Sequence, residues 1–206
     1  MNEIVDWQGE LGQDRFVVDL LGGRKHGYFV EFGAMSGRQY SNSWVLEKYF
    51  AWQGILSEPN PRFHHELANN RSCTIDNRAV WTKTGSDMDF VCRHHGYSGL
   101  AEPGRAYSEE VITVKTVSLN DLLDAHAAPA VIDYISMDTE GSELDILTEF
   151  DWSPRRVLIW TIEHNHHAER RAGIQQIMAA NGYRWVRQNA TKYDDWFVHG
   201  ELGGQE

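Results

Sequence analysis

The stretch that decides the fold is Tyr28-Phe29-Val30-Glu31-Phe32-Gly33-Ala34-Met35-Ser36-Gly37. Its first three residues form a short apolar run that predicts a buried strand, and residues 32–37 predict a turn. A helical pattern follows, with Leu46 on its apolar face. A strand, a glycine turn and a helix in this order present backbone N–H groups to a ligand at the carboxyl end of an α/β sheet.

The spacing of the glycines narrows the class of ligand. Glu31 occupies the position of the first glycine in the G-x-G-x-x-G dinucleotide fingerprint, so the turn reads E-x-G-x-x-x-G. A carboxylate at this position repels a pyrophosphate and attracts a cationic amino group or a sulfonium. The turn therefore favours a positively charged nucleoside such as S-adenosylmethionine over NAD. A purely structural turn after a buried strand is the alternative.

Composition predicts one soluble globular domain. The chain has 206 residues, of which 41% are hydrophobic and 24% are charged. It contains no apolar run of the ~20 residues that span a membrane. An acidic N-terminus without signal-peptide character and only two cysteines, without metal-type spacing, favour the cytoplasm. The net charge of −11 argues against a nucleic-acid partner and favours a small neutral or cationic substrate.

The second predicted strand, residues 54–57, ends in Glu58-Pro59-Asn60-Pro61. Asn60 is a good N-cap and Pro61 a good first helical residue. Glu58 follows the glycine turn by just over twenty residues, where nucleoside-binding sheets place an acid that accepts hydrogen bonds from the ribose hydroxyls. A surface glutamate beside a turn is the alternative interpretation.

Three later strands also end in polar residues. Residues 73–75 lead to Asp76 and Asn77, which either bind an adenine amino group or only form a turn. Residues 131–137 lead to the block Asp138-Thr139-Glu140-Gly141-Ser142-Glu143, in which we expect Ser142 to cap the next helix. Residues 157–162 lead to Glu163-His164-Asn165-His166-His167. The sequence therefore places its chemistry at the carboxyl edge of the sheet.

Four segments follow from the pattern of apolar residues and glycines. We expect an N-terminal helical extension over 1–26 with a helix at 14–21, a main domain over 27–199, a β-arm insertion over 82–115 and a tail over 200–206. Strands and helices alternate along the main domain, and residues 183–186 and 195–198 predict a terminal antiparallel β pair. This order predicts an α/β fold with a mostly parallel sheet and helices on both faces.

Several of these stretches together resemble the FkbM family of S-adenosylmethionine-dependent methyltransferases. The most specific are the Glu-Pro-Asn-Pro block at 58–61 and the Asp-x-Glu-Gly-x-Glu block at 138–143. Others are residues 30–37, 40–43, 54–57, 162–165 and 182–183. The resemblance implies a Rossmann-like seven-stranded sheet and methyl transfer, usually to a hydroxyl of a sugar, polyketide or similar natural product.

The resemblance also implies roles for individual residues. Glu31, Gly33, Ala34 and Gly37 would hold the amino-acid part of the cofactor, and Ser41 or Asn42 would reach its carboxylate. Glu58 would hold the ribose, Asn77 or Ala79 would lie near the adenine, and Asp138 would face the methyl group and the substrate.

An alcohol must lose its proton to accept a methyl group, and two routes are open. His164 or His166 would act as general base beside Asp138, although a solvated histidine loop is the alternative. Otherwise Mg²⁺, held by Asp138, Glu163 and Asn165, would acidify the hydroxyl. We expect a small-molecule acceptor and neither a nucleic-acid nor a membrane partner, and we leave a homo-oligomer open. A protein that binds the cofactor without catalysis and a nicotinamide-dependent oxidoreductase are the rival functions.

Overall fold

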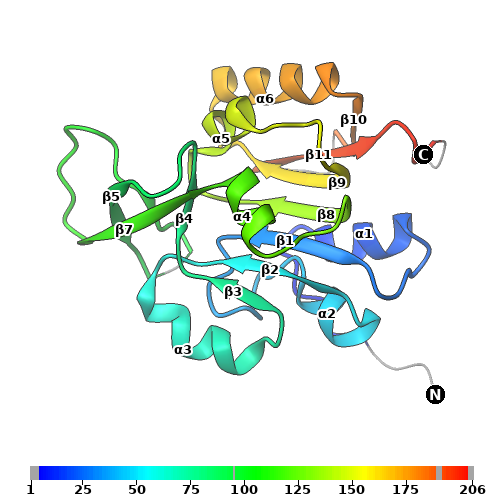
Figure 1. Ribbon diagram of the computed structural model, residues 1–206, viewed down its shortest axis with the longest axis horizontal. Coiled ribbons are helices and arrows are strands. Elements are labelled where there is room, and N and C mark those ends of the chain that lie inside the picture. The colour runs from blue at the N-terminus through cyan, green and yellow to red at the C-terminus, as the bar shows by residue number, and fades with distance from the viewer. Residues whose placement is uncertain (1–4, 95, 189–191, 204–206) are drawn as a thin grey trace.

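A seven-stranded sheet forms the centre of the protein in the computed structural model, which describes residues 5–94, 96–188 and 192–203 (Figure 1). Its strand order is β10-β11-β9-β8-β1-β2-β3. The strands are β1 (Tyr28–Phe32), β2 (Gln53–Ser57), β3 (Thr74–Asp76), β8 (Val131–Met137), β9 (Arg156–Glu163), β10 (Tyr183–Val186) and β11 (Asp194–His199). Strands β3, β2, β1, β8 and β9 run parallel, whereas β11 is antiparallel to both β9 and β10.

The strand order reverses beside β1. From β1 the chain builds outward through β2 and β3, and it then returns to the other side of β1 with β8 and β9. Ligands of open α/β sheets bind at such a switch point, beyond the carboxyl ends of the strands. The topology therefore directs attention to the turn after β1 and the residues after β8.

The helices pack against the sheet through two groups of buried side chains. They are α1 (Gln13–Leu20), α2 (Trp44–Phe50), α3 (Pro61–Asn70), α4 (Leu119–Ala125), α5 (Glu143–Glu149) and α6 (Ala168–Ala180). Phe29 of β1 belongs to a cluster with residues of α1, α2 and α3, whereas Val30 belongs to a cluster with residues of α4, α5 and α6. Because successive strand residues point to opposite faces, the two clusters lie on opposite faces of the sheet.

One of the two predicted helix caps, Asn60, is confirmed, and Ser118 provides a further cap. The Asn60 side chain accepts a hydrogen bond from the backbone of Arg62 at the start of α3, and Ser118 accepts one from the backbone of Asp121 in α4. The prediction for Ser142 was wrong. Its side chain caps no backbone group of α5, and its hydroxyl donates instead to Thr139 at 2.8 Å.

A second, four-stranded sheet lies beside the carboxyl ends of the main strands, at the left of Figure 1. It consists of β4 (Ala79–Trp81), β7 (Glu110–Ser118), β5 (Asp87–Cys92) and β6 (Gly99–Leu100), in that spatial order. Strands β5 and β6 and most of β7 lie within the range predicted for the β-arm. The sheet also recruits β4 and the end of β7, which lie outside the predicted range of 82–115.

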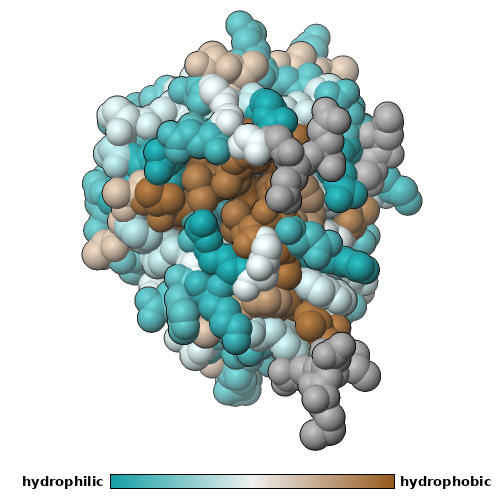
Figure 2. All heavy atoms as spheres, turned by 90° about the vertical axis from the view of Figure 1, so that its right-hand side faces the viewer, coloured by the Kyte–Doolittle hydropathy of each residue, from teal (hydrophilic) through white to brown (hydrophobic). Residues whose placement is uncertain are grey.

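The amino ends of the parallel strands lie on the opposite side. Figure 2 shows that face, where apolar residues cover the centre and polar residues surround them. Val131 at the start of β8 is an exposed apolar residue. Residues 1–4 and 204–206, at the outer ends of the predicted extension and tail, lie outside the described residues. Within the described ranges, no helix has the length and apolarity needed to cross a membrane.

Candidate functional site

Three cavities meet at Asp138, the first residue after β8. The apolar cavity has walls formed by residues such as Phe63, Ala79 and Phe90. The polar cavity, of about 60 Å³, is lined by residues that include Asn42. The acidic cavity is the largest at about 490 Å³, within the range of small-molecule sites. Its acidic lining residues are Glu10, Glu66, Asp138, Glu140 and Glu163.

Gly33 allows the turn after β1 to lie against the end of β8. Its backbone has a φ of +73°, and a Cβ atom at this position would lie 2.5 Å from the carbonyl oxygen of Asp138. Gly33 lines both the apolar and the acidic cavities, and Ala34 lines the acidic one. Gly37, with a φ of +76°, is needed for packing, because a Cβ there would lie 2.5 Å from Leu67.

Glu31 lies behind the cavities and holds the loop before α2. Its carboxylate accepts hydrogen bonds from the backbone N–H of Asn42 at 2.7 Å, from the Ser41 hydroxyl at 2.8 Å and from the Ser43 hydroxyl. Arg71 lies 3.8 Å away, and only 3% of the Glu31 surface is exposed. Glu31 lies outside the three cavities. Its surroundings therefore do not favour the direct contact with a cationic ligand that we expected from the sequence.

Ser41 and Asn42 face different cavities. Ser41 lines the acidic cavity, but its hydroxyl oxygen already accepts hydrogen bonds from the backbone of Trp44 and from Arg71. Asn42 lines the polar cavity and donates its Nδ2 to Ser136 at 2.9 Å. The Asn42 Oδ1 is buried without a hydrogen-bond partner among the described residues.

Glu58 is a buried carboxylate in the wall of the apolar cavity. Its two oxygens accept backbone N–H groups from Met35 at 2.7 Å and from Asn60 at 2.8 Å. Only 3% of its surface is exposed, and this burial raises the pKa of Glu58 to about 7. Because each oxygen can accept a second hydrogen bond, the side chain remains able to bind hydroxyl groups.

The residues predicted to lie near an adenine do not all line the same cavity in the structure. Ala79 lines the apolar cavity. Asn77 is exposed and lies outside the three cavities. Asp76 accepts hydrogen bonds from Arg78 and is 2.9 Å from the His126 ring. Ala79 is therefore the member of this set that the fold brings to the cavity.

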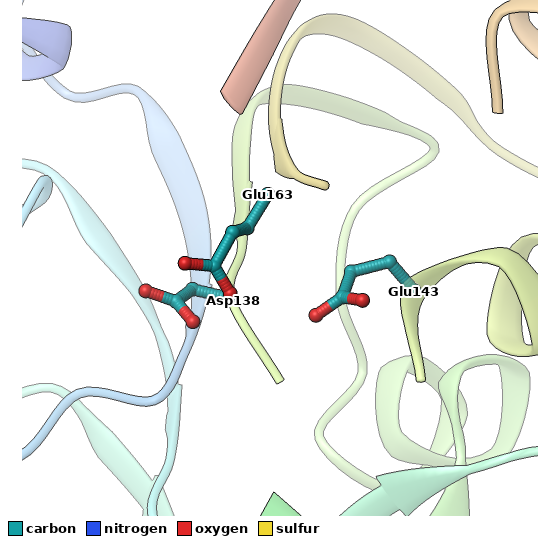
Figure 3. Close-up of side chains that lie close together, drawn as sticks. All are labelled: Asp138, Glu143 and Glu163. Atoms are coloured by element: carbon teal, nitrogen blue, oxygen red, sulfur yellow. The ribbon is translucent and has the colours of Figure 1, made fainter. Parts of the chain in front are cut away.

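Asp138 and Glu163 bring their carboxylates together, and Glu143 points toward them from the start of α5 (Figure 3). One oxygen of each residue lies within 4.8 Å of the others. Burial and the charge of Glu140 raise the pKa of Asp138, and burial together with Asp138 raises the pKa of Glu163. The pair therefore retains a proton at neutral pH.

Asn165 contacts this acidic group through its amide nitrogen. Its Nδ2 donates to Glu163 at 2.8 Å and to Glu140 at 3.1 Å. Asp138, Glu163 and Asn165 were predicted to bind the metal together. Asn165, however, turns its amide nitrogen toward the carboxylates, and a nitrogen that donates hydrogen bonds cannot serve as an oxygen ligand. Glu143 completes the nearest oxygen set, although its Oε1 already accepts backbone N–H groups of residues 139 and 141.

Glu140 is a candidate base that the sequence reasoning did not single out, although it lies in the quoted 138–143 block. It lines the acidic cavity, and burial raises its pKa to about 7. Its backbone is left-handed, with a φ of 59°. Met35, Tyr40 and Asn165 in the same cavity are also left-handed. Such backbone strain in non-glycine residues is concentrated at functional sites.

The histidines that were expected to act as bases lie outside all three cavities. His164 is buried, and its Nδ1 accepts the backbone N–H of His166 at 3.1 Å. Burial also lowers the pKa of His164, although its Nε2 is 3.7 Å from Asp195. His166 is exposed and packs on the ring of Tyr193. The structure therefore gives neither histidine the access to a ligand that a base requires.

Comparison with known proteins agrees with the geometry. The family model "Methyltransferase FkbM domain" matches residues 31–185. No curated protein matches the chain. Among solved structures, a METTL16 MTase domain is 11% identical with a TM-score of 0.53, over 96% of this chain and 68% of that one.

A precorrin-6y C5,15-methyltransferase from Geobacter metallireducens is 10% identical with a TM-score of 0.49, over 90% and 85% of the two chains. Human methyltransferase 10 domain containing protein is 12% identical with a TM-score of 0.49, over 96% and 83%. At these identities the structural likeness concerns the fold alone.

Proposed function

Because the chain belongs to the FkbM methyltransferase family, we propose that it transfers a methyl group from S-adenosylmethionine to a hydroxyl group of a small sugar or natural-product-like molecule. The observation that carries the proposal is the meeting of three cavities at Asp138, at the switch point of the sheet.

The residues around the apolar cavity fit the adenosine part of this cofactor. Glu58 lines the wall with two oxygens that can each accept one more hydrogen bond, as the two ribose hydroxyls require. Phe63, Ala79 and Phe90 offer apolar surfaces for the flat adenine base, and the cavity between them, of about 30 Å³, has to widen to admit it. Gly33 keeps the turn free of a side chain that would meet Asp138.

The charges of the acidic cavity fit a cationic methyl donor. Five carboxylic acids line it, and its lining residues include no lysine or arginine within the described part of the chain. Burial, and after it the charge of Glu143, raise the pKa of Glu140, and a bound cation would favour its ionised form. A pyrophosphate would be repelled here, so the nicotinamide-dependent oxidoreductase is the weaker alternative.

When bound, S-adenosylmethionine would supply an electrophilic methyl group on its sulfonium. The protein would hold the acceptor hydroxyl in line with that group, and such orientation can contribute ~7–11 kcal/mol. We assign the acceptance of the hydroxyl proton to Glu140, since a pKa of about 7 suits a general base at neutral pH. Asn165 would orient the carboxylate through its hydrogen bond.

Mg²⁺ is the second route to an activated hydroxyl. The oxygens of Asp138, Glu143 and Glu163 lie within 4.8 Å of one another, and Mg²⁺ prefers oxygen ligands. The route requires release of the proton that Asp138 and Glu163 retain, and it predicts that activity needs added Mg²⁺ and is lost with a chelator. The Glu140 route predicts activity that a chelator leaves unchanged.

The size and rim of the acidic cavity support a small acceptor. Tyr40, Tyr97 and Tyr193 line it and are exposed. Their ring faces can stack on a sugar or another ring, and their hydroxyls can hydrogen-bond to it. The acidic lining disfavours a nucleic-acid acceptor because it would repel the phosphates.

The experiment incubates the protein with S-adenosylmethionine and a panel of hydroxylated sugars and natural products, and measures S-adenosylhomocysteine release. Turnover that falls by roughly 10²–10⁴ in Glu140→Gln would support both the reaction and the base. The variant must still bind S-adenosylhomocysteine as the wild type does. Binding of the cofactor with no turnover of any acceptor would instead favour the binding-only alternative.

A further inference from the structure

A further groove, of about 440 Å³, lies at the amino ends of β8 and β9, on the side of the molecule that Figure 2 shows. We call it the amino-end groove. Residues 130–131 and 152–156 form it together with Asn181, Tyr183 and His199. The seven residues of β8 separate it from Asp138 by about 20 Å. The groove therefore has the size of a small-molecule site, and the proposed reaction does not use it.

The charge of the groove is opposite to that of the chain as a whole. The chain has 30 acidic residues against 19 lysines and arginines, which gives the net charge of −11. The groove is lined by two arginines, Arg155 and Arg156, and its lining includes no aspartate or glutamate in the part of the chain that the structure describes. An anion is attracted to such a lining and a cation is repelled.

Both arginines keep hydrogen-bond donors for a ligand. Arg155 donates its Nη2 to Asp124 at 2.6 Å, and Arg156 donates its Nη1 to Glu201 at 3.0 Å. These acids lie outside the lining, and their side chains are 67% and 57% exposed, so the ion pairs contribute little. The Arg155 Nη1 and the Arg156 Nη2 have no hydrogen-bond partner within the described ranges. A ligand can therefore bind them at small cost.

The rest of the lining offers one more donor and apolar surface. The Nδ1 of His199 accepts the backbone N–H of Glu201 at 3.3 Å, so its Nε2 carries the ring proton and can donate. The ring of Tyr183 lies 5.2 Å from the His199 ring and 5.8 Å from the Trp152 ring. Val131 beside them is an exposed apolar residue. The groove thus fits a molecule that combines an anionic group with an apolar part.

We propose that the amino-end groove binds a small organic anion. Its phosphate or carboxylate group pairs with the guanidinium groups of Arg155 and Arg156, whose planar geometry suits both anions. Its apolar part lies against Trp152 and Val131. The inference does not rest on the proposed methyl transfer, because it uses other residues at the opposite end of the sheet.

Arg156→Gln removes one of the two cations. The side chain is exposed at the start of β9, where a glutamine is readily accommodated. Arg15→Gln is the matched control. It also removes one positive charge and one exposed ion pair, with Asp19, but it lies on α1 and outside the groove.

Backbone-amide NMR spectra of the isotope-labelled full chain are recorded during titration with three probes. Phenyl phosphate and benzoate each join an anionic group to a ring, and benzyl alcohol is the neutral counterpart. We expect saturable shifts at residues 130–131, 152–156 and 199 with at least one of the two anions, and none there with benzyl alcohol. The anion that binds more tightly identifies the preferred group. We expect its affinity to fall roughly tenfold in folded Arg156→Gln and to stay unchanged in Arg15→Gln.

Three results would overturn the site. The first is the absence of saturable shifts at the groove with either anion. The second is equal affinity of the wild type and folded Arg156→Gln, since the arginine would then make no contact. The third is a wild-type dimer that leaves the probes unbound and becomes a monomer in Arg156→Gln, which would assign the groove to a second copy of the chain. Shifts confined to the carboxyl end of the sheet count as the first result.

Discussion

Replacing Glu58 by glutamine tests how the protein holds the ribose. In the wild type each carboxylate oxygen accepts one backbone N–H, from Met35 at 2.7 Å and from Asn60 at 2.8 Å. A glutamine offers only one oxygen, so its NH₂ group must face one of these N–H donors and cannot accept from a ribose hydroxyl. Hydrogen bonds to charged groups contribute about 1.5–3 kcal/mol each. Loss of one such bond therefore weakens cofactor binding by roughly 10–100-fold.

The pKa of Glu58 adds a second signature. Burial raises it to about 7, so the carboxylate is largely protonated at pH 6 and largely ionised at pH 8. The ratio of wild-type to Glu58→Gln affinity should therefore grow between pH 6 and pH 8. The assay is calorimetric titration with S-adenosylhomocysteine at both pH values. Glu169→Gln, on the exposed first turn of α6, controls for the loss of one charge.

A folded Glu58→Gln protein that binds S-adenosylhomocysteine as tightly as the wild type would refute the ribose assignment. A tenfold loss of affinity with no dependence on pH would keep the contact but refute the proposed ionisation of Glu58.

Three further predictions concern stability. In denaturant titration, Gly33→Ala should lower the free energy of unfolding by about 1–3 kcal/mol more than Gly85→Ala does. Both glycines have a positive φ, but of the two only Gly33 has an atom within 4 Å of the added methyl group. Equal losses would show that the close approach of Gly33 to Asp138 is unimportant. Arg71→Met should cost about 3–5 kcal/mol, since it leaves the buried carboxylate of Glu31 without its cation and Glu47 with Lys48 alone. A loss under about 1 kcal/mol in urea unfolding would contradict this. The neutral form of Glu58 stabilises the unliganded fold fully below pH 4.5, its ordinary pKa, and this contribution is lost as the pH rises through about 7. The melting temperature of Glu58→Gln should therefore rise relative to that of the wild type between pH 4.5 and about 7. A difference in melting temperature that stays constant over this range would contradict the raised pKa of Glu58.

Local sequence features could be predicted because they depend on neighbouring residues. The strand before Glu31 and the strand before Glu58 follow from short apolar runs, and both form. Asn60 and Pro61 begin α3 as expected, because capping satisfies backbone groups only two residues away. The order of strands and helices, read in this way, was enough to place Asp138 at the carboxyl edge of the sheet.

The direction in which a side chain points could not be predicted in the same way. His164 follows directly after β9, yet its ring lies outside the cavities, while Glu140 two residues beyond Asp138 lines one. The polar cavity depends on Gln13 and Asp194, which come from opposite ends of the chain. No local pattern specifies such a contact, because it arises only when α1 and β11 pack beside each other.

The identity of the ligand that the site binds is the most direct test of the proposed methyl transfer. Calorimetric titration of the full chain with S-adenosylmethionine and, separately, with NAD⁺ tests this. We expect saturable binding of S-adenosylmethionine with one site per chain, and no measurable binding of NAD⁺. Binding of NAD⁺ without binding of S-adenosylmethionine would contradict it, because the acidic cavity would then accommodate the pyrophosphate that its charge is argued to exclude.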